Sequence, residues 1–144
     1  MLMTGSPAID AERAFAKAAR ARRRAALLRR LRRAPAACGR LAVYDERARG
    51  GASVARGVRE VPLAAIAGTV EPSRASMFDP SFRPAAPARG RWQRLWLAEY
   101  RGAVLPPISV VRVGDQYAVR DGHHRVSVAR ARGALTIDAV VDAG

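Results

Sequence analysis

The sequence predicts a small α+β domain that follows a basic N-terminal helix. Residues 8–33 form a long run of helix-favouring residues without Gly or Pro. Residues 108–119 alternate in a way that is typical of a β-hairpin. A helical segment from His123 to Gly133 and an apolar strand at 135–141 complete the pattern. Strands and helices therefore alternate irregularly in the second part of the chain, which indicates the α+β class.

Length and charge limit what the protein can be. The 144 residues leave room for one domain and an extension, which we place at 58–144 and 1–57. The formal net charge is +14, and all but one of the 26 basic residues are arginine. Such a charge favours nucleic acid, nucleotides or another polyanion as partner. A genome rich in G and C would produce part of the same excess.

Other features exclude several classes of protein. Cys38 is the single cysteine, so no intrachain disulfide and no cysteine-based metal site can form. The first residues lack the charged and apolar regions of a signal peptide. No segment approaches the roughly 20 apolar residues of a membrane span. We therefore expect a cytoplasmic protein without a membrane span.

The helix predicted at 8–33 is basic and weakly amphipathic. Acidic residues lie near its start and arginines near its end, as the helix dipole favours, and Pro35 then stops it. The helix can lie on nucleic-acid phosphates, on lipid headgroups or against the domain, or it can be a solvated extension. For DNA, we expect the phosphates to be bound by an arginine cluster: Arg22, Arg23, Arg24, Arg29 and Arg30.

The middle of the chain has weaker signals. Residues 35–60 read as a linker, in which "RLAVYDERA" is expected to form a short helix. A strand begins at Val58, and Pro62 places it at an edge or at its own end. "PLAAIAG" is expected to be a helical turn that closes at Gly68. "RWQRLWLAEYRG" is predicted to be a helix ending at Gly102.

Residues 71–90 contain four prolines and predict a long ordered loop or a mobile lid. Two interpretations of its aromatic residues stand side by side. In the first, Phe78 or Phe82 stacks on the base of a bound ligand. In the second, both rings are buried against the helix that carries Trp92 and Trp96.

The predicted hairpin leads into "DGHHR", which contains both histidines of the protein. Gly122 can adopt a positive φ angle, and a helix begins directly after it. Unpaired amides and the positive end of the helix dipole then lie beside His123, His124 and Arg125, which predicts a phosphate site. Asp121 is open to three interpretations: a helix cap, a carboxylate bridged to phosphate by Mg²⁺, or a proton acceptor in catalysis.

The segment from residue 106 to residue 141 resembles the ParB/sulfiredoxin superfamily, in particular small ParB-like nuclease-domain proteins. This resemblance implies a mixed β-sheet flanked by helices over about residues 58–142. ParB partition proteins bind CTP and clamp DNA, with Gly-Glu-Arg-Arg where this chain has Gly122 to Arg125. Sulfiredoxins bind ATP and place a cysteine in the matching turn. Because this chain has Asp121-Gly122 there, sulfiredoxin chemistry is not expected.

Free-serine kinases of the superfamily carry Asp-Gly-His-His-Arg itself. By that resemblance, Asp121 serves catalysis or holds a metal, residues 122–125 hold phosphates, and Glu71 matches a second catalytic carboxylate. The expected ligand is a nucleotide (ATP, ADP or CTP) with Mg²⁺. The function is then a nucleotide-binding switch or adaptor, or alternatively a small phosphotransferase or nucleotide hydrolase, or a nuclease. We expect no helix-turn-helix after the last strand and therefore expect any DNA binding to use the N-terminal helix.

Overall fold

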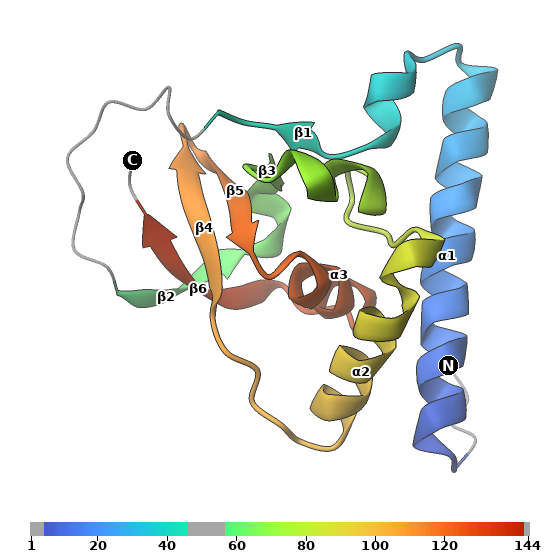
Figure 1. Cartoon of the computed structure of the whole chain (residues 1–144), viewed down its shortest axis with the longest axis vertical. Coiled ribbons are helices and arrows are strands. Elements are labelled where there is room, and N and C mark those ends of the chain that lie inside the picture. Colours follow the sequence, from blue (N-terminus) through green and yellow to red (C-terminus); the bar gives the residue numbers. More distant parts are fainter. Residues whose placement is uncertain (1–4, 46–56, 143–144) are drawn as a thin grey trace.

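The computed structural model describes residues 5–45 and 57–142 and contains a six-stranded sheet with three α-helices (Figure 1). The sheet order is β1-β3-β5-β4-β6-β2. The strands are β1 Ala42–Val43, β2 Val58–Pro62, β3 Ile66–Thr69, β4 Ile108–Val113, β5 Gln116–Asp121 and β6 Thr136–Asp142. The helices are α1 Pro7–Leu31, α2 Arg89–Tyr100 and α3 His123–Ala131.

Parallel and antiparallel pairs share this sheet, which is therefore mixed. Strands β4 and β5 form the predicted antiparallel hairpin, with Gly114 at a positive φ of 59° in its turn. Strand β5 runs parallel to β3, and β4 runs parallel to β6. The edge position of β2 confirms what Pro62 indicated. The α+β class, the mixed sheet and the basic N-terminal helix are all as the sequence predicts.

Two local predictions were wrong. The helical turn expected to close at Gly68 spans only Leu63–Ala65, and the chain continues as β3. The short helix expected in "RLAVYDERA" is replaced at Ala42–Val43 by β1, which pairs with β3, while residues 46–48 lie outside the described residues. Glycine makes this pairing possible, because a Cβ atom on Gly68 would lie 2.2 Å from the carbonyl oxygen of Ala42.

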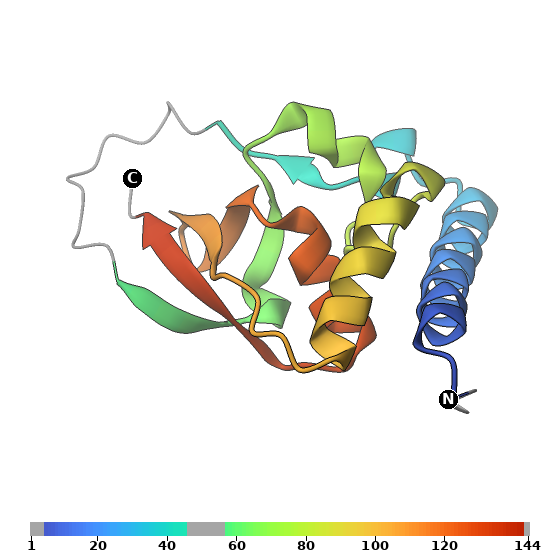
Figure 2. The same ribbon diagram turned by 60° about the horizontal axis from the view of Figure 1, so that its bottom comes forward.

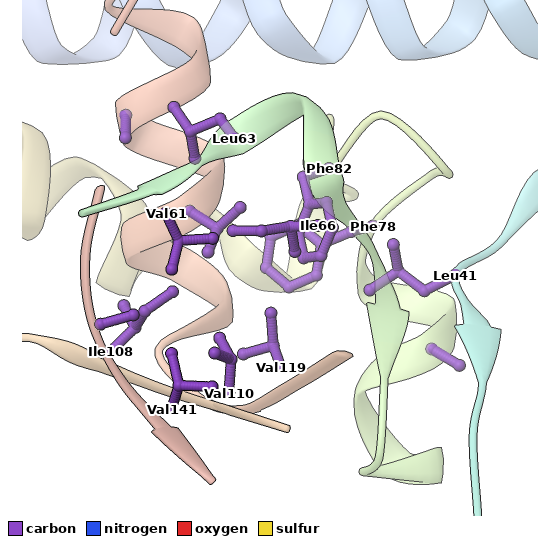
Figure 3. Close-up of a cluster of buried hydrophobic side chains, with 14 of the residues drawn as sticks. Leu41, Val61, Leu63, Ile66, Phe78, Phe82, Ile108, Val110, Val119 and Val141 are labelled. Atoms are coloured by element: carbon purple, nitrogen blue, oxygen red, sulfur yellow. The ribbon is translucent and has the colours of Figure 1, made fainter. Parts of the chain in front are cut away.

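The main core lies between the sheet and α3. Figure 3 shows side chains from β2, β3, β4, β5 and β6 gathered under this helix together with two phenylalanines of the 71–90 loop. Alternate residues of the strands face this core, as in a sheet covered on that face. The largest side chains that are completely buried there include Leu41, Ile66, Phe78, Phe82 and Ile108.

The 71–90 loop is an ordered part of the fold. It contains short 3-10 turns at Pro72–Met77 and Ala86–Ala88. Buried Asp79 holds its centre, because one carboxylate oxygen accepts hydrogen bonds from the amides of Ser81 and Arg83, each at 2.9 Å. Phe78 and Phe82 are 0% and 1% exposed, so the expectation that either ring stacks on a ligand base was wrong. Their burial was expected against the tryptophan helix, whereas they belong to the main core.

Helix α1 lies alongside α2, on the side of α2 that faces away from the sheet (Figures 1 and 2). Phe15 packs edge-on against Trp92 with ring centroids 5.5 Å apart, so the packing interpretation holds for the first half of the helix. In the second half Leu27 and Leu31 are 57% and 72% exposed. The division of the chain at residue 57 stays a prediction. None of the described helices is both long enough and apolar enough to cross a bilayer.

Candidate functional site

The turn between β5 and α3 forms because Gly122 permits it. Strand β5 ends at Asp121, and Gly122 caps α3 in the left-handed region, with φ 109° and ψ 24°. A Cβ atom at this position would lie 2.4 Å from Cγ2 of Ile108 in the neighbouring strand. Both the φ angle and the lack of space therefore require glycine. The first-turn amides of α3, which have no acceptors within the helix, consequently lie at the end of the hairpin.

A cavity of about 390 Å³ opens at this turn and brings the predicted residues together. Glu71 and the whole segment Asp121 to Arg125 line it, although Glu71 lies far away in the sequence. Three arginines that the site prediction did not include also line it: Arg74, Arg91 and Arg120. Arg91 comes from the first turn of α2, which no sequence spacing relates to the hairpin. The cavity is thus more strongly cationic than the motif indicates.

His123 is held in place by the protein interior. Its residue is 4% exposed, and its Nε2 atom lies 2.6 Å from the hydroxyl oxygen of Thr69 in β3. The Phe78 ring is nearly parallel to the imidazole, with centroids 6.4 Å apart. Burial, followed by the charges of Arg74 and His124, lowers the pKa of His123 from 6.5 to about 4. This imidazole is therefore neutral near pH 7.

His124 occupies a similar environment on the next position of the helix. It is 6% exposed, and Phe78 packs edge-on against it with centroids 5.2 Å apart. Burial, followed by the charges of Arg91 and Arg74, lowers its pKa from 6.5 to about 4. Two imidazoles whose protonation is opposed by nearby arginines indicate a positive local field.

Arg125 is bound by the chain itself. Its Nη1 atom donates to the carbonyl oxygens of Pro106 and Pro107 at 2.7 and 2.9 Å. Its Nη2 atom donates to the carboxylate of Asp121 at 3.1 Å. The guanidinium therefore fixes the segment before β4 against the start of α3. The phosphate-binding role of residues 122–125 stays a prediction.

Two cations remain available in the cavity. Arg120 is paired with Asp142 across the sheet. Arg74 donates only to the sulfur of Met77, at 3.5 Å, among the contacts of the described residues. Within the described part of the chain, neither Arg74 nor Arg91 has a carboxylate partner. A bound anion would supply that partner, since these side chains flank both histidines.

The acidic residues lie at the rim of the cavity. The Asp121 side chain is 79% exposed, and Glu71 is also exposed. Across residues 5–45 and 57–142, no three side chains of the types His, Cys, Asp and Glu group as a metal site would require. A metal ion here would have Asp121 as a protein ligand and would need phosphate oxygens to complete its coordination.

The five arginines predicted to contact DNA are not equivalent. Arg23, Arg24 and Arg30 are exposed on α1. Arg22 and Arg29 are half-buried, and the Arg29 side chain lies beside Gly39 in the turn that follows the helix. Nucleic-acid contacts of all five arginines stay a prediction. The three exposed side chains are more accessible to a phosphate backbone than the two half-buried ones.

Fold and site together define an α+β protein with a cationic cavity at the start of its last helix. No protein-family model matches the chain, and a comparison with curated proteins also found no match. Among solved structures, the chain is similar to a sulfiredoxin from Arabidopsis thaliana, with 22% sequence identity, a TM-score of 0.45, and 61% of this chain and 86% of that chain covered.

Proposed function

We propose that the cavity at the start of α3 binds the phosphate groups of a nucleotide together with Mg²⁺. One observation carries this proposal: Arg74 and Arg91, without a carboxylate partner in the described chain, face two neutral histidines beside a helix N-terminus. Guanidinium groups and the amides of a helix N-terminus are well suited to bind phosphate oxygens. The expected ligands are ATP, ADP and CTP.

The neutral histidines suit a site whose imidazoles take up protons only when an anion is bound. Protonated imidazoles would add to the repulsion among the arginines, and burial opposes that protonation. A bound polyphosphate would offset the positive field and raise the pKa of both imidazoles. Asp121 at the rim would hold a Mg²⁺ ion bridged to phosphate, which removes the repulsion between carboxylate and ligand.

In this proposal the protein acts as a nucleotide-dependent switch or adaptor that associates with DNA. The exposed arginines of α1 supply the DNA contacts through phosphates, without base recognition. The cavity and α1 are connected through α2, whose first turn carries Arg91 and whose Trp92 packs against Phe15. Occupancy of the cavity can therefore influence the position of the basic helix through one short element.

A phosphotransferase or nucleotide hydrolase is the alternative function. Glu71 and Asp121 support it, because two exposed carboxylates line the same cavity as the arginines. One carboxylate would hold Mg²⁺ and the other would accept the proton of an attacking hydroxyl or water. Nothing in the cavity favours a nuclease in the same way.

Isothermal titration calorimetry with ATP, ADP and CTP in the presence of Mg²⁺ tests the binding proposal. Turnover assays on the same samples then separate the two functions. If Asp121→Asn abolishes release of phosphate while nucleotide still binds, the enzyme is supported. If the unchanged protein binds nucleotide without any turnover, the switch is supported. An absence of binding for all three nucleotides would reject both.

A further inference from the structure

A second cavity lies away from the start of α3, beside the C-terminal half of that helix. Its volume is about 580 Å³, and it is bordered by α1, α2, α3 and residues 81–84 of the loop. This volume is in the range of pockets that bind small organic molecules. None of its lining residues lines the cavity that contains the histidines. The two cavities are therefore separate sites of one molecule.

Small side chains on α1 leave this space open. Ala14, Ala18 and Ala21 face the cavity at intervals of four and three residues, which places them on one side of the helix. The opposite walls contribute Phe82, Pro84 and Trp96. A body of apolar atoms would fill the space between these walls better than water does.

The cations around the cavity are stronger evidence of a ligand. Its lining includes Lys17, Arg83, Arg130 and Arg132 but no carboxylate. Two of these charges are neutralised from outside the lining, because Asp79 pairs with Arg83 at 3.2 Å and Glu99 pairs with Arg132 at 3.3 Å. Within the described chain, Lys17 and Arg130 have no carboxylate ion pair.

Arg130 is the central cation of this group. Its Nη2 atom donates to the carbonyl oxygen of Leu63 at 2.6 Å, and its guanidinium lies over the Phe82 ring at 5.8 Å. Its Nε atom is buried and has no hydrogen-bond partner among the described residues. Burial lowers the pKa of Arg130, and the nearby Asp79 carboxylate opposes that shift. An anion in the cavity would compensate a guanidinium that the protein leaves only partly satisfied.

We propose that this second cavity binds a small organic anion with an apolar body, namely an alkyl or aromatic carboxylate or phosphate. The charged head pairs with Arg130 and Lys17, and the body lies along the alanine face of α1. The ligand contacts α1 on one side and α3 on the other, so it fastens the basic helix to the domain. This inference is independent of nucleotide binding at the start of α3.

Titration of the full chain with octanoate and with octyl phosphate, followed by amide NMR, tests this site. We expect both ligands to bind, with shifts at Ala14, Ala18, Ala21 and Arg130, and the tighter of the two identifies the preferred head group. Octanol should bind at least tenfold more weakly than the anions, because it lacks the charge (about 1.4 kcal/mol for each factor of ten). Octanol binding equal to that of octanoate, or no binding of either anion, would overturn the proposal.

Substitutions locate the site. Arg130→Met should weaken octanoate binding about tenfold, because it removes a partly buried charge and keeps an apolar chain. Lys17→Met removes a charge at an exposed position and should weaken octanoate binding by only about two- to fivefold. Ala18→Met fills the cavity and should abolish binding, whereas Ala8→Met on the exposed start of α1 should not change it. Unchanged affinity in Lys17→Met and Ala18→Met would reject the site even if Arg130→Met does not fold.

Discussion

The hydroxyl oxygen of Thr69 lies 2.6 Å from Nε2 of His123, and both residues are buried. The same oxygen accepts a hydrogen bond of 2.9 Å from the amide of Glu71. One side chain of β3 therefore orients the first residue of α3 and the start of the 71–90 loop. It connects two predicted site residues, Glu71 and His123, that are 52 positions apart in the sequence.

We predict that Thr69→Val destabilises the protein by about 1–3 kcal/mol, because it leaves the buried imidazole nitrogen of His123 without this partner. Valine has nearly the same shape, so packing changes little. Thr136→Val, at an exposed position of β6, is the matched control and should change the stability by less than about 0.5 kcal/mol. Urea unfolding measures both. Equal effects of the two substitutions would show that the Thr69 hydroxyl has no such role.

Protein stability should fall as the pH drops from about 6.5 to about 4. The pKa of His123 and of His124 is about 4 in the folded protein, below the value of 6.5 expected in the unfolded chain. The unfolded state therefore takes up protons first, so the stabilising contribution is complete above pH 6.5 and is lost toward pH 4. Each histidine contributes on the order of 1–3 kcal/mol.

An NMR titration of the imidazole resonances checks this pH dependence directly, and urea unfolding at pH 7, 5.5 and 4.5 gives the stabilities. Midpoints near 6.5 for both rings would contradict the account, because the rings would then not be buried beside arginine.

Gly122→Ala should destabilise the protein much more than Gly114→Ala. Both glycines have positive φ angles, 109° and 59°, so alanine is strained at either position. At Gly122 the new Cβ atom also meets Ile108 at 2.4 Å, whereas nothing lies within 4 Å of a Cβ at Gly114. We expect the free energy of unfolding to fall by about 1 kcal/mol for Gly114→Ala and by at least about 2 kcal/mol for Gly122→Ala. Thermal unfolding compares them, and similar losses would remove the argument for close packing at the turn.

Changing the exposed arginines of α1 should weaken any DNA binding and its dependence on salt. For the triple variant Arg23→Gln, Arg24→Gln and Arg30→Gln, the negative slope of log K against log salt should become shallower by about 3. The control is Arg40→Gln, Arg59→Gln and Arg94→Gln, which removes the same charge from exposed positions outside α1. Substitution is preferable to deletion of the helix, because deletion would uncover the contact of Phe15 with Trp92. Equal slopes in both triple variants would exclude α1 as the contact surface.

Local sequence patterns predicted most of the fold. The hairpin around Gly114 and the helix that begins after Gly122 follow from period-two and glycine signals that act over a few residues. Strand β3 was missed because "IAGT" has weak strand propensity, and its pairing with β5 and β1 decides its conformation. Pairing partners distant in sequence leave no local signal.

The candidate site was predictable only along the continuous segment Asp121 to Arg125. Glu71 was predicted as a site residue only from the resemblance to the superfamily, and in the structure it lines the same cavity. Arg91 could not be found, since an arginine in the first turn of a basic chain's helix is common and its direction depends on how α2 packs. The contacts of the Phe78 ring with both histidines were also missed, because they too depend on tertiary packing and leave no local signal in the sequence.

Calorimetric titration of the double variant Arg74→Gln and Arg91→Gln with Mg²⁺-ATP, Mg²⁺-ADP and Mg²⁺-CTP tests the proposed phosphate site most directly. The matched control is Arg94→Gln with Arg101→Gln, two exposed arginines outside the cavity. We predict that the first variant binds the preferred nucleotide at least about tenfold more weakly, while the control binds like the unchanged protein. Equal affinities for the two variants would contradict a phosphate site formed by these arginines at the start of α3.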